Sequence, residues 1–510
     1  MTRPRIAVIV GNQISGDSRV IKSAVSARRM GADVILIGTS PTSERQCSRL
    51  GDIVVVRVPA APSGSGARKI VSRSDQGWAI RPLAPLAFRS TEQYGRSSDR
   101  RTERRARTRE RIDGVKSAMR RDRGVGKVRH RIVLDVLRMR SLVLDAWFVL
   151  RRRAFVRSPI RVGRTPRQDS LQAFLEERLP FAAGFVEAMV PVLEEFEPDL
   201  IHAHDIFMAP VAATVAQRSR GRVRWIYDAH EWVAGLRVER AIPKTVAADE
   251  LERRVAGTAD AVMTVGEAMA DELLSGLGLS SRPTVVLNAP PEMSSAAPEQ
   301  RLRSAAGLAP DVPLLVYPGV VKPKRGLETV VEALPRLEGV HLAVMADLAS
   351  PHVRDLRQRA ADRGVDARLH LLPYVAPDQI APFISDATAG IYPLTHYPNA
   401  EMALPTKLLE YAQARLPVVV SDTREMAEFV RRHGVGEVFV SEDPADFAVA
   451  AQAVIDDPDR YRAGYSDALV SGYTWEEQER HLQALYESLL GQALQQPVGP
   501  FSIPAESPTP

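Results

Sequence analysis

The chain has 510 residues, more than one hydrophobic core supports, so its length predicts two domains. The 45% hydrophobic and 25% charged fractions are those of an ordinary globular protein. The single cysteine, Cys47, excludes an intrachain disulfide framework and a cysteine-based metal cluster, and it favours a reducing cytosol. The net charge of +6 is uneven: residues 67–167 carry 29 Lys or Arg against 9 Asp or Glu, a net of +20, which leaves −14 for the rest.

The N-terminal part has the pattern of strand, loop, helix and strand. Residues 6–10 are apolar, in a run too short for a signal peptide, and predict a buried first strand. A helix is expected at 18–30, and further strands at 34–37 and 54–56. This βαβ opening predicts an α/β fold with a doubly wound parallel sheet.

A basic insert at about 62–170 interrupts this pattern. Residues 93–111 are rich in arginine and nearly free of apolar residues, which predicts disorder or a solvated helix. Residues 132–155 have helical apolar spacing broken by Arg138 and Arg140. No uncharged run there reaches the ~18 residues of a membrane span, so we expect a helix lying in a membrane interface.

The charge of residues 67–167 has two interpretations. Anionic lipid attracts basic residues by roughly 1 kcal/mol each near the surface, so an anionic membrane surface is the expected partner. The chain is then cytoplasmic and peripheral on the inner face of the cell membrane; the alternative is an unstructured insert without a partner. Arginines that bind RNA usually occur with stacking aromatics, and residues 96–131 contain none, so no nucleic acid is expected.

The α/β pattern resumes after the insert. Residues 171–196 predict helices, and 199–205 and 224–231 predict strands that end in polar residues. Two more strands are expected at 261–265 and 284–288.

A second α/β unit follows a linker rich in proline and small polar residues at 289–299. Its apolar runs alternate with helical segments, which predicts a second doubly wound sheet. The expected strands are 312–319, 340–346, 369–372, 389–392 and 417–420.

The first candidate ligand loop begins at Gly319, where one of these strands ends. Glycine lets the backbone approach a ligand, and Lys322, Lys324 and Arg325 place cations near the start of the next helix. A pyrophosphate is the natural partner of such a loop. The alternative is a solvated basic loop without a ligand.

A second part of the same site is predicted where a loop leads into a helix. The loop ends at Leu404 and Pro405. The helix begins with Thr406 and Lys407, and Glu410 lies one turn further. Helix N-terminal N–H groups suit a phosphate and a carboxylate one turn later can bind paired sugar hydroxyls, so this segment predicts a nucleotide-sugar site. The alternative is a surface glutamate on an amphipathic helix.

Tyr374 and Val375 follow the strand expected at 369–372. Their backbone can pair with the edge of a nucleotide base, and they are assigned to the donor site on that ground. A plain exit from the strand is the alternative.

In the first domain, the loop after the first strand is a candidate for acceptor or cleft contact through Gly11, Asp17 and Arg19. Asp17, Arg19 and Lys22 can equally form a structural ion-pair cluster.

His230 lies at a strand end between Asp228 and Glu231. A lone histidine is usually structural, but one at the edge of the interdomain cleft can bind a sugar hydroxyl or the reacting centre. We therefore predict that His230 takes part in catalysis and that Glu231 lies in the cleft.

His202, His204 and Asp205 raise the alternative of a metal site. No third ligand at suitable spacing supports zinc, so no metal is expected, and His204 and Asp205 are predicted to lie in the acceptor cleft.

These segments together resemble the retaining GT-B glycosyltransferases of family 4 (glycosyl transferases group 1), over residues 5–58 and 180–490. The family's fold implies two Rossmann-like domains facing across a cleft. The motifs that carry the resemblance are Asp17-Ser18-Arg19-Val20, Tyr227-Asp228-Ala229-His230-Glu231, Arg325-Gly326, Leu404-Pro405-Thr406-Lys407-Leu408-Leu409-Glu410-Tyr411 and Tyr473-Thr474-Trp475-Glu476.

The domains expected from this resemblance are 1–290 for the acceptor and 291–475 for the nucleotide-sugar. Residues 476–496 are expected to form a helix returning to the first domain. The last residues, 497–510, are rich in Pro and Ser, which predicts a disordered tail.

The resemblance implies that Glu410 binds the donor ribose, Arg325 the diphosphate, and that His230 lies at the sugar or acceptor. Two positions differ from the family pattern. Met402 stands eight residues before Glu410, where the family has a glutamate, and Val320 follows Gly319, where the family has an arginine. Lys322 or Lys324 can supply that missing charge.

The expected function is transfer of a sugar from a nucleotide-sugar to a cell-envelope, lipid-linked or polysaccharide acceptor, with retention of configuration. Cations and helix N-termini can stabilise the leaving diphosphate, so neither a metal nor another cofactor is required beyond the nucleotide-sugar co-substrate. Two alternatives remain: a nucleotide-sugar epimerase of the same architecture, and a non-catalytic scaffold for a membrane or nucleic acid.

Overall fold

The computed structural model describes residues 3–59, 133, 139, 170–239, 242–293 and 300–508. The chain divides into two compact units, Met1–Ser63 with Leu175–Pro510, and Gly64–Phe174, and both described sheets belong to the first of them. The predictions for the basic insert, including the helix at 132–155 and the membrane partner of 67–167, lie outside the described residues apart from positions 133 and 139. Among the described residues, no helix combines the length and the apolar character needed to span a bilayer.

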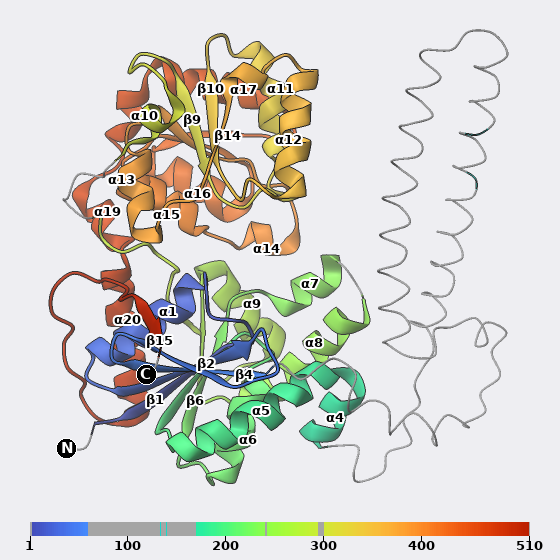
Figure 1. Cartoon of the computed structure of the whole chain (residues 1–510), viewed down its shortest axis with the longest axis vertical. Coiled ribbons are helices and arrows are strands. Elements are labelled where there is room, and N and C mark those ends of the chain that lie inside the picture. Colours follow the sequence, from blue (N-terminus) through green and yellow to red (C-terminus); the bar gives the residue numbers. More distant parts are fainter. Residues whose placement is uncertain are drawn as a thin grey trace. The chain divides into compact units, whose positions relative to one another are not determined.

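The first sheet has nine strands in the described residues, in the order β15-β3-β4-β2-β1-β5-β6-β7-β8 (Figure 1). All neighbouring pairs are parallel except β3, which is antiparallel to both β4 and β15. Buried apolar runs such as β1 explain this sheet, because parallel strands are covered on both faces. The strands are β1 Arg5–Ile9, β2 Asp33–Ser40, β3 Gln46–Leu50, β4 Ile53–Pro59, β5 Leu200–His204, β6 Arg224–Ala229, β7 Ala261–Thr264, β8 Thr284–Val285 and β15 Glu506–Pro508.

Helices with local start signals connect these strands. The Asp17 side chain caps the first helix, α5 begins with a proline, and the Thr474 side chain caps α20, whose end is a left-handed glycine, Gly491. The helices of this part are α1 Ser18–Arg29, α4 Leu171–Arg178, α5 Pro180–Phe196, α6 Ala209–Arg218, α7 Val233–Glu239, α8 Pro243–Val255, α9 Glu267–Leu277 and α20 Trp475–Leu490, with a 3-10 turn at Ala256–Thr258.

The second sheet has six parallel strands in the described residues, in the order β11-β10-β9-β12-β13-β14. The strands are β9 Leu314–Pro318, β10 His341–Met345, β11 Leu369–Leu372, β12 Ala389–Tyr392, β13 Val418–Ser421 and β14 Gly436–Phe439. The helices are α10 Leu302–Ala306, α11 Leu327–Ala333, α12 Pro351–Asp362, α13 Ile380–Ile384, α14 Pro398–Glu401, α15 Thr406–Gln413, α16 Arg424–His433, α17 Pro444–Asp456, α18 Pro458–Arg462 and α19 Asp467–Gly472, with 3-10 turns at Leu334–Arg336, Asp366–Arg368 and Pro377–Gln379. The predicted α/β fold with two doubly wound sheets is confirmed.

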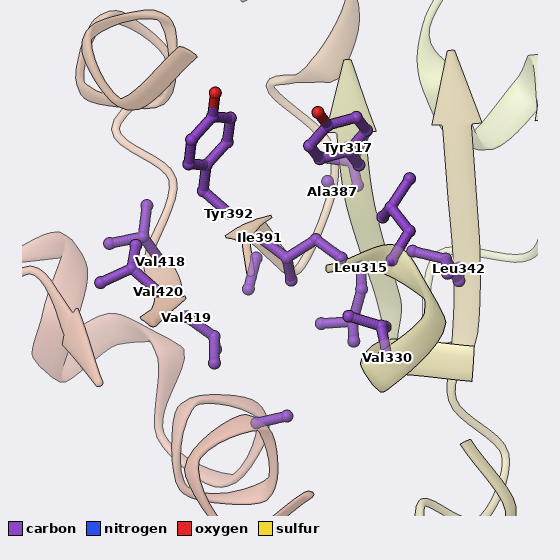
Figure 2. Close-up of a cluster of buried hydrophobic side chains, with 14 of the residues drawn as sticks. Leu315, Tyr317, Val330, Leu342, Ala387, Ile391, Tyr392, Val418, Val419 and Val420 are labelled. Atoms are coloured by element: carbon purple, nitrogen blue, oxygen red, sulfur yellow. The ribbon is translucent and has the colours of Figure 1, made fainter. Parts of the chain in front are cut away.

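The second sheet is held by a continuous apolar core (Figure 2). Leu315, Ile391 and Val419 come from three adjacent strands, and Val330 of α11 belongs to the same core. The buried Tyr411 hydroxyl donates toward the carbonyl oxygens of Val316 and Ile391, at 3.0 and 2.9 Å, and so fixes α15 to β9 and β12. This bond holds in place the helix that was predicted to carry the donor site.

The C-terminal residues differ from the disordered tail expected for 497–510. Strand β15 pairs with β3, and the Glu506 carboxylate accepts hydrogen bonds from both terminal nitrogens of Arg57. Phe501 is buried and its ring lies 6.0 Å from that of Trp475. One aromatic anchor and one ion pair therefore order a segment whose proline-rich composition suggested a loose tail.

Candidate functional site

The site residues predicted in the first domain lie at the carboxyl ends of β1, β5 and β6, which are neighbours in the sheet. Gly11 follows β1, His204 ends β5, and His230 follows β6. Ligands bind at this edge of open parallel sheets, particularly where the strand order reverses, as it does between β1 and β5. The fold therefore brings together three segments that lie far apart in the sequence.

Asp228 is the centre of the polar cluster at this edge and is fully buried. Arg19 donates to both of its carboxylate oxygens, each at 2.8 Å. The ring nitrogens of three histidines lie close to Asp228 Oδ2: His204 Nδ1 at 3.0 Å, and His202 Nε2 and His230 Nε2 at 3.3 Å. A buried carboxylate is stable here because it has this many donors.

The environment of the cluster shifts the pKa values of Asp228 and of the three histidines in different directions. Burial alone would raise the pKa of Asp228, but Arg19 and His230 outweigh it and hold that pKa well below its usual range. Burial lowers the pKa of both His202 and His204, so their rings are neutral. Burial also opposes the charged form of His230, but Asp228 and Asp205 overcome it and raise its pKa. His230 is therefore the histidine of this cluster that carries a proton most readily.

His230 is also the most accessible histidine of the cluster, with 18% of its side chain exposed. Its Nδ1 lies 3.4 Å from Asp205 Oδ1, and its Nε2 lies 3.0 Å from the Nδ1 of His204. Asp205 has a left-handed backbone with φ of 66°, an uncommon conformation for a residue with a side chain. Two carboxylates thus hold the imidazole at the edge of the sheet.

The metal alternative has a third ligand that sequence spacing did not reveal. His202, His204 and Asp228 each offer a ligand atom, and these atoms lie within 4.8 Å of one another. The donor set suits a divalent cation. The guanidinium of Arg19 on the same carboxylate is a like charge for any cation and opposes its binding.

Asp17, Arg19 and Lys22 do not form the alternative ion-pair cluster among themselves. Asp17 accepts from the backbone N–H of Val20 at 3.4 Å, and Lys22 donates to the carbonyl of Ala289. Burial lowers the pKa of Lys22 to about 7, and its ammonium lies 4.5 Å from the centre of the Trp475 ring. The three residues have separate structural partners.

A pocket of about 660 Å³ opens beside the N-terminus of α1. It lies between the loop after β1, the end of β2 and the segment after β8. Its lining residues are Asn12, Gln13, Ser15, Gly16, Asp17, Ser18, Thr39 and Asn288.

In the second domain, the loop after β9 and the helix α15 lie against each other. A side chain at Gly319 would come within 2.1 Å of Lys407 Cε, so the lysine crosses directly over this glycine. Arg325 is half-buried and donates to the Tyr392 hydroxyl at 2.9 Å. Lys407 therefore lies directly over Gly319, and Arg325 belongs to the loop that begins at this glycine.

The two other predicted cations of this loop have different environments. Lys324 forms an ion pair with Glu239 of α7, and its ammonium lies 4.8 Å from the centre of the Tyr397 ring. Lys322 is exposed. Because its charge is already compensated, Lys324 is less available to a phosphate than Lys322 or Arg325.

Glu410 lies in α15 with 6% of its surface exposed, and its Oε2 atom has no hydrogen-bond partner. Burial raises its pKa, and Lys407 and Lys22 oppose that shift. An unpaired buried carboxylate oxygen is costly, and a bound ligand that donates a hydrogen bond would remove that cost. The alternative of a surface glutamate is therefore wrong, since the side chain is buried.

The other residues predicted for the donor site have varied environments. The Thr406 hydroxyl donates to the carbonyl of Asn288 at 2.9 Å, which places the start of α15 beside the pocket at α1. Leu404 and Val375 pack against the second core, whereas 48% of Tyr374 is exposed after β11. Pro405 precedes α15 without a side-chain cap on the helix.

Several residues of this region escaped the sequence analysis. Asn399 binds both backbone groups of Trp232, at 2.7 and 3.2 Å, and so joins α14 to the segment after His230. Asn288 lines the pocket, and the buried Tyr486 hydroxyl lies 2.7 Å from His202 Nδ1. The position of Asn288 at the end of a predicted strand was the available signal. The contacts of Asn399 with Trp232 and of Tyr486 with His202 span 167 and 284 residues, so no local sequence pattern indicates them.

Family models match both halves of the chain. Residues 312–457 match the family described as Glycosyl transferases group 1, and residues 121–289 match the Glycosyl transferase 4-like domain. The sheets and their strand-end site therefore define a GT-B glycosyltransferase fold. The chain belongs to the glycosyltransferases of family 4.

Similar proteins with assigned activities are distant relatives. A glycogen synthase of Mycobacterium tuberculosis is 26% identical over 292 residues, which are 55% of this chain and 66% of that protein, just under two thirds of its length. A D-inositol 3-phosphate glycosyltransferase of Geodermatophilus obscurus is 26% identical over 340 residues, 61% of this chain and 72% of that one.

Solved structures share the fold at low identity. Sucrose-phosphate synthase from Thermosynechococcus elongatus has a TM-score of 0.60 at 15% identity, covering 96% of this chain and 100% of that one. The Anabaena protein HepE, solved in complex with UDP and glucose, has a TM-score of 0.57 at 14% identity, covering 95% of this chain and 100% of that one.

Proposed function

We propose that this chain transfers a sugar from a nucleotide-sugar donor to an acceptor hydroxyl, with retention of configuration. The single observation that carries the proposal is the unpartnered, buried Oε2 of Glu410. A carboxylate can accept from both hydroxyls of a ribose, which would remove the cost of leaving that oxygen unpaired.

The neighbouring groups suit the diphosphate of such a donor. Lys407 crosses over Gly319, and Arg325 lies in the loop that begins there. No side chain caps the first turn of α15, and although the Leu408 N–H donates to the Pro405 carbonyl, the helix N-terminus still favours an anion. Val320 stands where the family has an arginine. The exposed side chain of Lys322 can supply that positive charge.

The reaction needs charge stabilisation at the leaving group. The bond between the sugar carbon and the phosphate oxygen breaks, and its electron pair remains on the diphosphate. The acceptor oxygen bonds to the same face of that carbon, and its proton passes to the departing phosphate oxygen. Arg325, Lys322 and Lys407 stabilise the developing negative charge, so this mechanism does not depend on a metal. His230 contributes a polarised N–H group at the sugar or acceptor.

The positive charge of residues 67–167 supports a membrane-associated acceptor and location. We propose an acceptor in the cell envelope, lipid-linked or polysaccharide, and a cytoplasmic protein that attaches peripherally to the membrane through residues 67–167. Similarity to a glycogen synthase and to a D-inositol 3-phosphate glycosyltransferase, and the UDP and glucose bound to HepE, support glycosyl transfer from nucleotide-sugars.

The variant Glu410→Gln tests the donor site. We expect donor binding to weaken roughly tenfold, the effect of one lost charge-assisted hydrogen bond. Titration calorimetry with UDP-, GDP-, ADP- and TDP-sugars measures this, after a thermal-shift screen has identified the ligand. Glu428→Gln, on the exposed face of α16, is the matched control and should bind as the wild type does. Unchanged donor affinity in Glu410→Gln would contradict the assignment.

Product analysis with a donor labelled in the sugar separates transfer from epimerisation. A transferase moves the label to an acceptor, whereas an epimerase leaves it on the nucleotide. The anomeric configuration of the product, read by NMR, tests retention.

A further inference from the structure

The pocket beside α1 has the polarity of a binding site for hydroxyl groups. Most of its lining residues are amides and hydroxyls, which both donate and accept, as sugar hydroxyls do. Its volume of about 660 Å³ lies within the range of small-molecule sites, roughly 300–1,000 Å³. Its one ionisable lining residue among the described residues is Asp17.

The helix N-terminus at this pocket is already occupied by a carboxylate. A free helix N-terminus attracts phosphate through its N–H groups and its dipole. Here the Asp17 carboxylate accepts from the N–H of Val20 at 3.4 Å and from the amide of Asn12 at 2.8 Å. An incoming phosphate would therefore meet a like charge instead of free N–H groups.

The cations nearest to this pocket are already paired with other groups. Arg57 donates to the Gln13 carbonyl, but its guanidinium is paired with Glu506. Arg19 is paired with Asp228, and Lys22 is buried against the linker. Among the residues that the structure describes, no lysine or arginine lines the pocket.

Building on the proposed function, we propose that this pocket binds the reacting end of the acceptor. That end is an uncharged polyhydroxylated ring. The Asp17 carboxylate selects against acceptors that carry a phosphomonoester on this ring. Asn288 connects the pocket to the donor side, because its backbone carbonyl accepts from Thr406 at the start of α15. A neutral acceptor would distinguish this chain from the D-inositol 3-phosphate glycosyltransferase of Geodermatophilus obscurus, whose name specifies a phosphorylated cyclitol.

The test compares acceptors in pairs, using the full chain and the donor identified by thermal shift. Each pair consists of a neutral ring and its phosphomonoester: methyl glucoside and its 6-phosphate, methyl mannoside and its 6-phosphate, and myo-inositol and its 3-phosphate. We expect kcat/KM at least roughly tenfold higher for the neutral member, because like charges brought together cost binding energy.

The variant Asp17→Asn removes the charge and keeps an equally good helix cap. We expect it to narrow the preference for the neutral member several-fold, mainly by lowering KM for the phosphorylated one. Asp52→Asn, an exposed aspartate in the turn before β4 with the same loss of charge, should leave the preference unchanged. An unaltered preference in Asp17→Asn would overturn the role of that carboxylate.

The other outcomes are equally decisive. Equal or better transfer to the phosphorylated members overturns the inference while the proposed transferase function stands. Donor binding and slow donor hydrolysis without transfer to either member of any pair overturn the acceptor class alone. Failure to bind any nucleotide-sugar overturns the proposed function, and the inference falls with it.

Discussion

Lys22 lies on α1 with 2% of its surface exposed, between the linker carbonyl of Ala289 and the ring of Trp475. Burial is the main cause that lowers its pKa to about 7, and Arg19 adds to it, while Glu410 and Glu476 oppose the shift. An unfolded lysine keeps its proton up to about pH 10.4. Between these values the unfolded chain binds more protons than the folded one, so folding stability rises with pH.

We predict that the wild-type protein gains about 2 kcal/mol of stability from Lys22 between pH 7 and pH 9, and that Lys22→Met abolishes this gain. Urea unfolding at the two pH values measures it. Lys244→Met, which removes an exposed lysine from α8, should retain the full dependence on pH. If Lys22→Met shows the same rise as the wild type, the buried lysine is not its source.

At the scale of elements, the loop between β9 and α11 depends on a close backbone approach. Gly326 has φ of +70°, and a Cβ atom there would lie 1.6 Å from the carbonyl oxygen of Pro393. The loop and the segment after β12 therefore touch with no room for a side chain. This contact fixes Arg325 beside Tyr392.

We predict that Gly326→Ala destabilises the protein by several kcal/mol and weakens nucleotide-sugar binding, because the loop must move away from Pro393. Gly339→Ala is the matched control, since Gly339 has φ of +69° and a Cβ atom there would have open space within 4 Å. It should cost only the conformational penalty, about 1–2 kcal/mol, and leave binding intact. Thermal unfolding and calorimetry measure both. Equal effects of the two substitutions would show that the contact is unimportant.

Buried elements could be predicted from the sequence because their signals are local. Strands such as β1, β9 and β13 are apolar runs of four or five residues, and each was expected near its observed position. Strand β3, with the sequence QCSRL, was missed because it has mostly polar residues and lies near the sheet edge. Strand β14 was missed because its four residues, GEVF, include a glycine and a glutamate.

The candidate site was predicted unevenly for a similar reason. Most residues assigned to the donor side lie in two short segments, around Arg325 and Glu410, whose spacing is visible in the sequence, and Tyr374 and Val375 form a third. The cluster around Asp228 depends on Arg19, 209 residues away, and on His202, 26 residues away. Only the order of the strands brings these side chains together, so their contact could not be derived from spacing.

At the scale of the whole molecule, the C-terminal segment connects distant parts of the first domain. Figure 1 shows strand β15, at the red end of the chain, next to the blue N-terminal strands. Glu506 joins Arg57, and Phe501 packs on Trp475. The segment therefore closes the edge of the sheet that β3 would otherwise expose.

We predict that a chain ending at residue 496 is less stable by about 2 kcal/mol or more, chiefly from the lost burial of Phe501. A chain that lacks only residues 509 and 510 keeps these contacts and should unfold as the full chain does. The midpoint and slope of urea unfolding distinguish the two. If the chain ending at residue 496 is as stable as the full chain, β15 and Phe501 contribute nothing to the stability of the fold.

The polypeptide passes between the two sheets twice, once after β8 and once before α20. The backbone N–H of Trp475 donates to the carbonyl of Pro290 at 2.7 Å, so the two crossings are bonded to each other. Because these two chain segments are bonded at one point, rotation of one sheet relative to the other about that point is easier than translation. A rotation of one sheet against the other that keeps this hydrogen bond would therefore turn close to Trp475, whose indole N–H donates to the Ser26 hydroxyl of α1 at 3.0 Å.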